Sequence, residues 1–511
     1  MENLSYKKFL SDSFKDMQED FDELLYLYSS SLSYLQTFFA DLIKSKNNIP
    51  KGSYQTVLTQ TKVYINDFSE GIIFLKAVKE DIKNAKQTAT KLKEYSDIKE
   101  KYFHLLRSQQ GLIGALITST DWQSPSFYHT TQSFAGRQTG QITPNYGDYK
   151  RDEHMDERPY QQAFLQEYVD GFVKLPVRVY LTNSGMAAFT TILNFLFMEN
   201  KIKVPLLIGK SAYHENEELV SKILGKHVVT VNESDTETII KTIKEKNPSV
   251  IIFDSLTNTE EVALPDLKTI ITYLVKNAKK DIYVVIDNTC LSIHFQPLSL
   301  VLAKNKNVHL VVFESLLKYH QFGMDRVTGG IIWAYGKDVG ELFYTREHSG
   351  TNILDSSVYA LPKPNRKVLT KRLRRFERNT KVLAHYLSEK IKEKNTIFDG
   401  INYPAISYHR AFLQSQKMSF HGSFFTISFK KDYKNVKTYK RFVTAIIEEA
   451  KRQDVNIVSG TSFGFNTTRI YLTALKTDFA IPFIRVSVGT EHRLDLEKIK
   501  NVFSNVIDKF H

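Results

Sequence analysis

Residues 308–318 read VHLVVFESLLK, an apolar run of strand length that ends in polar residues and Lys318. A run this rich in branched side chains predicts a strand buried on both faces, as in a parallel sheet. Ligands of α/β proteins bind beyond the carboxyl ends of such strands, which is where Lys318 stands. Apolar surroundings lower the pKa of a lysine and make its amine reactive. A surface lysine with its stem lying along the protein is the alternative explanation.

Two other polar positions also follow predicted strands. In VVIDNTC (284–290), Asp287 ends a buried run, where a carboxylate needs a partner or caps the next turn. In LTNSGMAA (181–188), a small-residue turn precedes a helix, whose first N–H groups favour a phosphate. Each feature alone has an ordinary structural explanation. Phosphate turn, acid and lysine in this order favour pyridoxal 5'-phosphate (PLP), because a carboxylate on the PLP ring nitrogen makes the ring an electron sink.

Short β-rich runs alternate with helix-length segments from about residue 175, which predicts an α/β domain with a largely parallel sheet. Its seven predicted strands are VRVYLT (177–182), PLLIG (205–209), HVVTV (227–231), SVIIFDS (249–255), YVVIDNT (283–289), VHLVVFES (308–315) and GGIIWAY (329–335). A helix-rich segment, about 361–395, leads to a smaller α/β region with three predicted strands: FFTISF (424–429), VNIVSG (455–460) and FIRVSV (483–488).

The N-terminal part has a different pattern. Apolar residues recur at three- and four-residue steps from Phe14 to Leu42, and two further helical patterns follow, up to about residue 115. We interpret these helices as a packing or oligomerisation element. The stretch 118–160 is irregular, and so long a loop is usually functional or an arm on a neighbour. The predicted parts are a helical extension (1–115), an arm (116–160), a PLP-binding domain (161–360) and a C-terminal substrate-carboxylate domain (361–511).

Composition excludes several function classes. The net charge of +13 is spread along the chain, and its densest basic run, Lys371 to Asn379, is helix-like; we expect a solvated surface rather than a nucleic-acid interface. No apolar run is long enough for a membrane span, and the N-terminus has no apolar signal core. One cysteine, Cys290, excludes an intramolecular disulfide and a cysteine-based zinc site. We therefore expect a cytoplasmic protein with no metal.

The motifs together resemble those of the Cys/Met-metabolism family of PLP-dependent enzymes, which includes cystathionine synthases, cystathionine lyases and methionine γ-lyase. The resemblance runs from about Pro125 to the C-terminus. It implies the aminotransferase-like fold (fold type I), with a mostly parallel seven-stranded sheet, and a homodimer or homotetramer with shared active sites. The helical N-terminal region has no counterpart in the usual family members.

The resemblance also implies roles for individual residues. Lys318 would form an imine with PLP, Asp287 would face the ring nitrogen and Tyr213 would stack on the ring and assist proton transfer. The other cofactor-binding residues would be Ser184, Gly185, Met186, Asn258, Thr289 and Ser315, with Tyr149 and Arg151 reaching the phosphate of the neighbouring subunit. Arg485 would clamp the substrate carboxylate, Ser462 and Gly464 resemble the family's Ser-x-Gly loop, and Arg372 and Asn379 fit its helix after the cofactor domain.

Two departures bear on the reaction. Leu317 stands where the family usually has a phosphate-binding threonine, and the acid found near Thr467 in many lyases is absent. Arg469 lies close by, which suggests a substrate with a distal carboxylate or phosphate. The expected activity is β- or γ-elimination or replacement on an amino acid (C–S or C–O bond chemistry, as a lyase or transferase). The alternatives are another PLP reaction, such as aldol-type cleavage, decarboxylation or amino transfer, and a non-catalytic scaffold.

Overall fold

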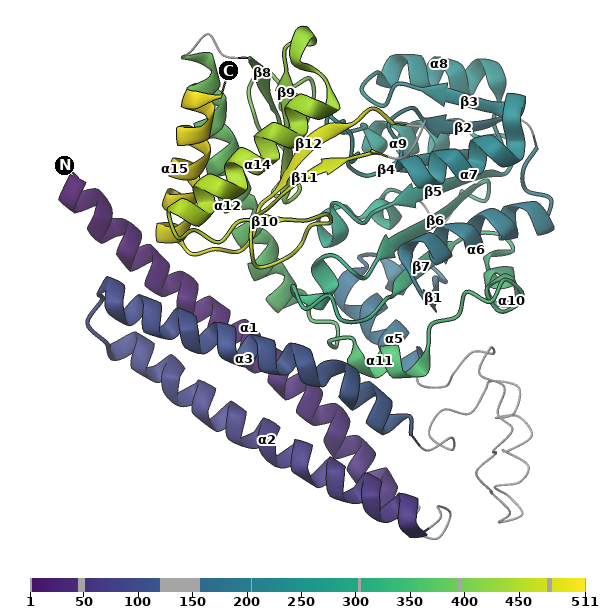
Figure 1. Cartoon of the computed structure of the whole chain (residues 1–511). Coiled ribbons are helices and arrows are strands. Elements are labelled where there is room, and N and C mark those ends of the chain that lie inside the picture. Colours follow the sequence, from purple (N-terminus) through teal and green to yellow (C-terminus); the bar gives the residue numbers. More distant parts are fainter. Residues whose placement is uncertain are drawn as a thin grey trace.

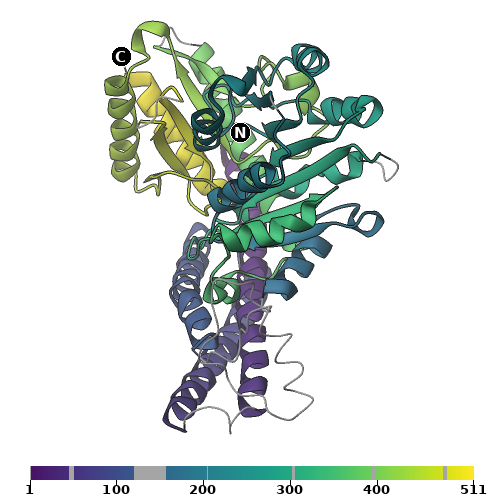
Figure 2. The same ribbon diagram turned by 90° about the vertical axis from the view of Figure 1, so that its right-hand side faces the viewer.

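The computed structural model describes residues 2–44, 51–119, 157–203, 205–301, 305–393, 397–475 and 480–510. The first helices are α1 (Glu2–Lys44), α2 (Lys51–Asn84) and α3 (Ala89–Ile117), and they lie side by side along a body built on two sheets (Figure 1). Figure 2 shows that part of this helical layer projects beyond the body. The prediction of an all-helical N-terminal region is confirmed.

The apolar stripe of α1 is buried within this chain. Phe14, Met17 and Phe21 are at most 1% exposed, and α1 packs on α2, on α3 and on helices of the body. Phe14 meets the ring of Tyr95 on α3 edge-on, so the stripe of α1 is buried mainly between the N-terminal helices and in part against the body.

The amino end of α15 (Arg493–Lys509) is closed by α1. Asp16 accepts a hydrogen bond from the amide of Arg493 (3.1 Å), and the Ser13 hydroxyl accepts one from the amide of Leu494 (3.0 Å). The first N–H groups of a helix have no partner inside the helix itself. Side chains of α1 thus satisfy two backbone donors of a helix far away in the sequence.

The larger sheet contains all seven strands that the sequence predicts. They are β1 (Arg178–Thr182), β2 (Leu206–Gly209), β3 (Val228–Val231), β4 (Val250–Asp254), β5 (Ile282–Asp287), β6 (Val308–Ser315) and β7 (Gly330–Tyr335), in the order β1-β7-β6-β5-β4-β2-β3. Strands β3, β2, β4, β5 and β6 are parallel, and β7 runs antiparallel to β6 and β1. The prediction of a mostly parallel sheet is confirmed.

Helices surround this sheet (Figure 1). They are α5 (Glu157–Tyr168), α6 (Gly185–Met198), α7 (His214–Leu224), α8 (Thr236–Lys246), α9 (Leu267–Asn277), α10 (Leu342–His348) and α11 (Asp355–Ala360). Because the sheet is covered on both faces, the central strands β4, β5 and β6 are apolar almost throughout. This arrangement leaves the strand ends as the place for polar chemistry.

The long helix α12 (Arg366–Lys392) leads to the second sheet. Its strands are β8 (Phe398–Asn402), β9 (Phe424–Phe429), β10 (Val458–Ser459), β11 (Arg469–Thr473) and β12 (Phe483–Ser487), in the order β10-β11-β12-β9-β8. Helices α13 (Phe412–Ser415), α14 (Val436–Arg452) and α15 complete this part. The run VNIVSG gives only a two-residue strand, and β8 and β11 are additional to the predicted strands. The part boundaries near 115, 160 and 360 remain predictions.

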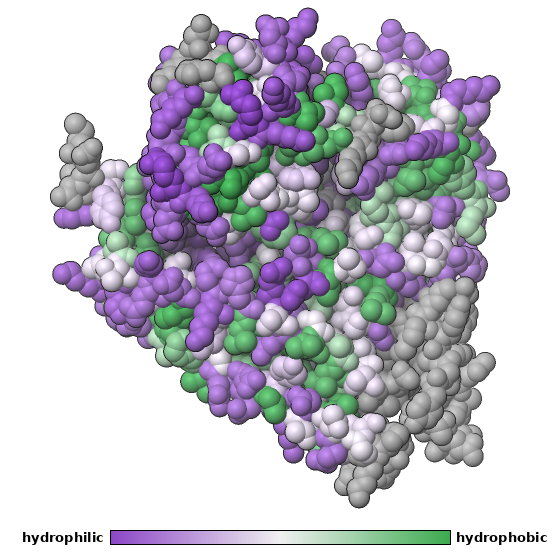
Figure 3. Space-filling model, in the orientation of Figure 1, coloured by the Kyte–Doolittle hydropathy of each residue, from purple (hydrophilic) through white to green (hydrophobic). Residues whose placement is uncertain are grey.

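The visible face of the molecule mixes hydrophilic residues with small hydrophobic groups (Figure 3). Across the part of the chain that the structure describes, no helix has both the length and the apolar character that crossing a bilayer requires.

Candidate active site

The predicted site residues gather at the carboxyl ends of β4, β5 and β6. Asp254 ends β4 and is the register partner of Asp287, which ends β5. Lys318 follows β6 on the neighbouring strand. Parallel strands bring their carboxyl ends to one edge, so a carboxylate pair and an amine far apart in sequence lie on the same rim.

Lys318 meets a loop of the C-terminal part. Its Nζ donates a hydrogen bond to the Ser462 hydroxyl at 2.8 Å. Burial, and after it the positive charge of Arg485, lower the pKa of Lys318. Gly464 makes the close approach of this loop possible: it has φ +88°, and a Cβ there would lie 2.8 Å from the carbonyl carbon of Lys318. The structure therefore places Ser462 and Gly464 against the predicted reactive amine.

The turn before α6 has the features of a phosphate site. Ser184 caps the helix, because its hydroxyl accepts a hydrogen bond from the amide of Ala187 (3.0 Å). The amides of Gly185 and Met186, in the first turn of the helix, have no partner within it. A Cβ on Gly185 would lie 2.8 Å from the Cβ of Ser315, so only glycine lets the turn pack this closely on the end of β6.

Hydrogen bonds connect the predicted acid to the end of β6, on which this turn packs. The Thr289 amide donates to Asp287 Oδ1 (2.9 Å), and the Ser315 amide donates to the Thr289 hydroxyl (2.9 Å). Burial raises the pKa of Asp287 to about 6, in spite of the Thr289 hydrogen bond. A positive charge next to Asp287, such as a protonated ring nitrogen, would stabilise its ionised form.

Tyr213 lies over the same edge. Its amide donates to Asp254 Oδ2 (3.0 Å), which fixes the start of α7. Burial, followed by the negative charge of Glu215, raises the pKa of Tyr213, so its phenol stays protonated. Burial and the neighbouring Asp287 also raise the pKa of Asp254. Asp254 is not among the predicted site residues, although it ends a buried strand just as Asp287 does.

Arg485 connects both parts of the site. It is 3% exposed, and its NH1 donates to Asn258 Oδ1 (2.7 Å) while its NH2 donates to the Ser462 carbonyl (3.2 Å). Burial lowers the pKa of Arg485 to about 10, still high enough to keep it charged at neutral pH. Ser462 therefore contacts Lys318 through its hydroxyl and Arg485 through its carbonyl.

Arg469 is the first residue of β11, shortly after this loop, and has a different environment. Its guanidinium carbon is 3.4 Å from the centroid of the Phe465 ring, and its NH1 donates to the Thr461 carbonyl (3.1 Å). Its predicted contact with substrate stays a prediction. Tyr149 and Arg151 lie outside the described residues.

A family model described as Cys/Met metabolism PLP-dependent enzyme matches residues 124–501. The chain belongs to this family. The match begins after the end of α3, so the whole N-terminal helical region lies outside it.

The chain is also similar to individual proteins, and to a solved structure in fold. The chain is 23% identical over 366 residues to the bifunctional enzyme flvA of Aspergillus flavus, covering 71% of this chain and 43% of that protein. It is 29% identical over 244 residues to putative cystathionine gamma-lyase 2 of Caenorhabditis elegans, covering 44% and 54%. The chain thus spans about half the length of these curated relatives. A cystathionine gamma-lyase structure from Lactobacillus plantarum, complexed with L-serine, has a TM-score of 0.55 at 19% identity and covers 72% of this chain and 90% of that one.

The described residues fit PLP, the cofactor of the family. The turn at Ser184 and Gly185 would hold its phosphate, Asp287 would face its ring nitrogen and the amine of Lys318 would reach its aldehyde. Where most family members have a phosphate-binding threonine, Leu317 offers its amide, which donates weakly to the Ser315 hydroxyl (3.4 Å).

Gln321 is a residue that sequence reasoning missed. Its amide nitrogen donates to the carbonyls of Leu316 (3.2 Å) and Val327 (2.7 Å), and its oxygen accepts from the amide of Arg326 (2.9 Å). A buried glutamine with all these bonds holds the loop after Lys318 in one shape. No local sequence pattern distinguishes such a residue from a surface glutamine.

Proposed function

We propose that this family member catalyses β- or γ-elimination or replacement on an amino-acid substrate, with C–S or C–O bond chemistry. The observation that carries the proposal is that Lys318 and Arg485 both donate hydrogen bonds to Ser462. It brings a candidate proton-transfer group and a candidate carboxylate-binding group to one loop beside Asp287. The family and the similar cystathionine gamma-lyases support this reaction class.

In the proposed reaction, Arg485 binds the α-carboxylate, because a guanidinium fork matches a carboxylate in two hydrogen bonds. The free amine of Lys318, with its lowered pKa, then removes the proton from Cα as general base. PLP, when bound, supplies the electron sink that makes this proton removable. Protonated Tyr213 would assist by donating a proton to the departing β- or γ-substituent, and attack of water or another nucleophile would follow the loss of that substituent.

The substrate class can be tested together with Arg469. We propose that Arg469 binds a distal anion on the substrate, using donors that its Thr461 bond leaves free. Purified protein should be incubated with PLP, natural amino acids and their O-acetyl, O-succinyl and O-phospho derivatives, and assayed for keto acid, ammonia and thioether products. Arg469→Ala should raise KM for the anionic O-succinyl and O-phospho substrates by the equivalent of about 1.5–3 kcal/mol, the value of a hydrogen bond to a charged group.

The neutral O-acetyl derivative is the control for this test. If Arg469→Ala changes KM for neutral and anionic substrates alike, Arg469 acts on the loop and not on the substrate. Products of decarboxylation, aldol cleavage or amino transfer, without elimination or replacement, would contradict the proposed reaction class.

We also propose that the active unit is a homodimer or homotetramer in the cytoplasm, in which Tyr149 and Arg151 complete the neighbour's site. Mixing Arg151→Ala with Lys318→Ala subunits should then restore about one quarter of wild-type activity, because half of the dimers are hybrids with one intact site of two. Activity after subunit exchange measures this.

The control mixture is Asp287→Asn with Lys318→Ala. Asp287 and Lys318 belong to the same sheet of the same subunit. In a hybrid dimer, one site therefore carries Asp287→Asn and the other carries Lys318→Ala, so neither site is intact. Recovery in the control mixture, or none in the Arg151 mixture after proven exchange, would refute shared sites.

A further inference from the structure

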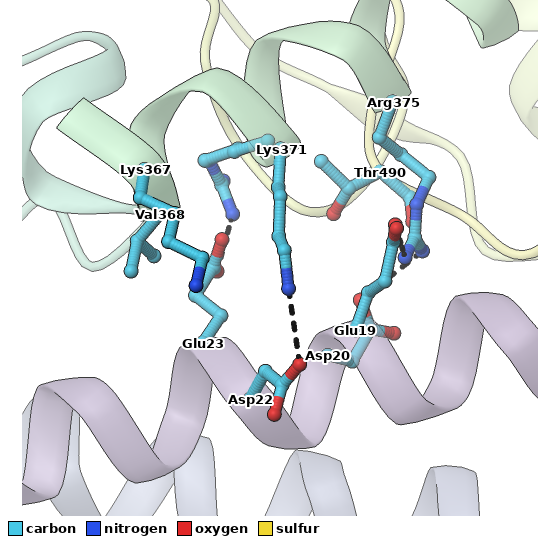
Figure 4. Close-up of a pocket in the computed structure, with 10 residues that line it drawn as sticks. Glu19, Asp20, Asp22, Glu23, Lys367, Val368, Lys371, Arg375 and Thr490 are labelled. Carbon is cyan, nitrogen blue, oxygen red and sulfur yellow. Dashed lines mark hydrogen bonds and ion pairs between the residues drawn. The ribbon is translucent and has the colours of Figure 1, made fainter.

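An ionic face joins α1 to α12. Four acids of α1 and four basic residues of α12 surround a cavity of about 240 Å³ (Figure 4): Glu19, Asp20, Asp22 and Glu23 face Lys367, Lys371, Arg372 and Arg375. The expectation that the basic run 371–379 is a solvated surface is wrong for much of its length. Arg372 and Arg375 are 3% and 5% exposed, and both are paired with acids of α1.

One pair in this face continues into the candidate active site. The NH1 of Arg372 donates to Glu23 at 2.6 Å. The NH2 of the same guanidinium donates to the Gly464 carbonyl (3.0 Å) and to Asn466 Oδ1 (2.8 Å). Glu23 therefore orients the Arg372 guanidinium toward the loop that carries Ser462. Ser462 in turn contacts Lys318.

The loop after Lys318 is held from the same side. The ring of Tyr26, on α1, meets the ring of Phe322 edge-on, with 5.8 Å between centroids. The Nε of Arg107, on α3, donates to the Met324 carbonyl at 2.6 Å. Gly323 packs against Arg372 itself, because a Cβ there would lie 3.0 Å from its NH2. The helical region thus contacts the loop after Lys318 directly, and it reaches the Ser462 loop through Arg372 of α12.

Stability alone is a poor explanation for the Glu23–Arg372 pair. Burial raises the pKa of Glu23 even though Arg372 is its partner, and burial lowers the pKa of Arg372. The loss of hydration is the largest influence on both pKa values, although the Glu23 side chain remains 18% exposed. Buried pairs of this kind contribute little net stability, whereas removal of one partner leaves the other charge uncompensated.

We propose that Glu23 is a positioning residue of the active site: it orients Arg372, which holds the Thr461–Asn466 loop and with it Ser462 and Gly464 against Lys318. The effect on catalysis rests on the proposed role of Lys318, but the effect on the loop does not. The helical region is then part of the catalytic apparatus of this family member.

Hydrogen exchange of the full-length protein, prepared both with and without PLP, tests the proposal. Glu23→Ala should make peptides covering 460–467 and 319–327 exchange roughly tenfold faster, the change expected when a hydrogen bond to a charged group is lost. Glu23→Gln, which keeps the shape and loses the charge, should give a smaller increase. Peptides of β4 and β5 should exchange as in the wild type, which separates a local effect from general destabilisation.

Asp22→Ala is the matched control. Asp22 directly precedes Glu23 on α1 and pairs with Lys79 and Lys371; among the described residues, neither lysine is hydrogen-bonded or ion-paired to the 461–466 loop. Wild-type exchange of both loops in Glu23→Ala, or an equal increase in Asp22→Ala, would overturn the proposal; if Glu23→Ala does not fold, Glu23→Gln decides. Because the test succeeds or fails without PLP, it is independent of whether Lys318 binds the cofactor.

Discussion

Lys318→Ala is expected to abolish turnover and the borohydride-stable attachment of PLP to the protein. The amine of Lys318 contacts Ser462 at the sheet edge that also carries Asp287, and it is the proposed base. Loss of general-base proton transfer alone lowers a rate by roughly 10²–10⁴-fold. Absorbance of bound PLP and the mass of the borohydride-reduced peptide measure attachment, and product formation measures turnover.

Lys306→Ala provides the matched control, since Lys306 lies just before β6, at the opposite end of the strand, and is exposed. It should keep wild-type attachment and activity. A Lys318→Ala protein that still gives the reduced adduct at wild-type stoichiometry would show that another lysine carries the cofactor.

Arg485→Ala is expected to have the second largest effect, mainly on KM. Removing a buried guanidinium that pairs with a substrate carboxylate costs about 2–5 kcal/mol of binding free energy. Arg485→Lys should recover part of the loss, because lysine keeps the charge without the two-pronged geometry. Steady-state kinetics should be measured with an amino acid and with its amine analogue, which lacks the α-carboxylate. The comparison separates the contribution of carboxylate binding from that of structural support.

If Arg485 binds the α-carboxylate, the carboxylate-free analogue should react equally slowly with wild type and Arg485→Ala. A large loss for that analogue too would mean that Arg485 mainly supports Asn258 and the Ser462 loop, both of which it contacts. Unchanged PLP binding by the variant shows that the cofactor site itself is intact.

The sequence predicts the large sheet well because its signal is local. Each central strand is a short run of branched apolar residues, and the polar residue that follows, such as Asp287 or Lys318, falls at the strand end by chain connectivity. The edge strand β8 was missed because FDGIN contains an acid, a glycine and an asparagine, which are poor strand formers. The run VNIVSG predicts a longer strand than the two-residue β10, because valine and isoleucine are good strand formers.

The site was predicted as separate motifs, and the contacts between them were not. Nothing near Ser462 in the sequence indicates that its hydroxyl meets Lys318 and its carbonyl meets Arg485. The basic run of α12 looked like a solvated surface because its partners, the acids of α1, are about 350 residues away, as for Arg372 and Glu23 (349). Such pairings depend on tertiary packing, which no local pattern records.

The capping of α15 by Ser13 and Asp16 has a consequence for the order in which the polypeptide folds. Asp16 leaves the ribosome 477 residues before Arg493. Most of the chain is therefore synthesised before the partners of the α1 acids, on α12 and α15, are available. Domains form from the N-terminal side as the chain is made. The three helices can therefore assemble early as a hairpin-like unit with a charged, unsatisfied side, and attach to the two sheets in a late step, when residues 366–392 and 493–509 have formed.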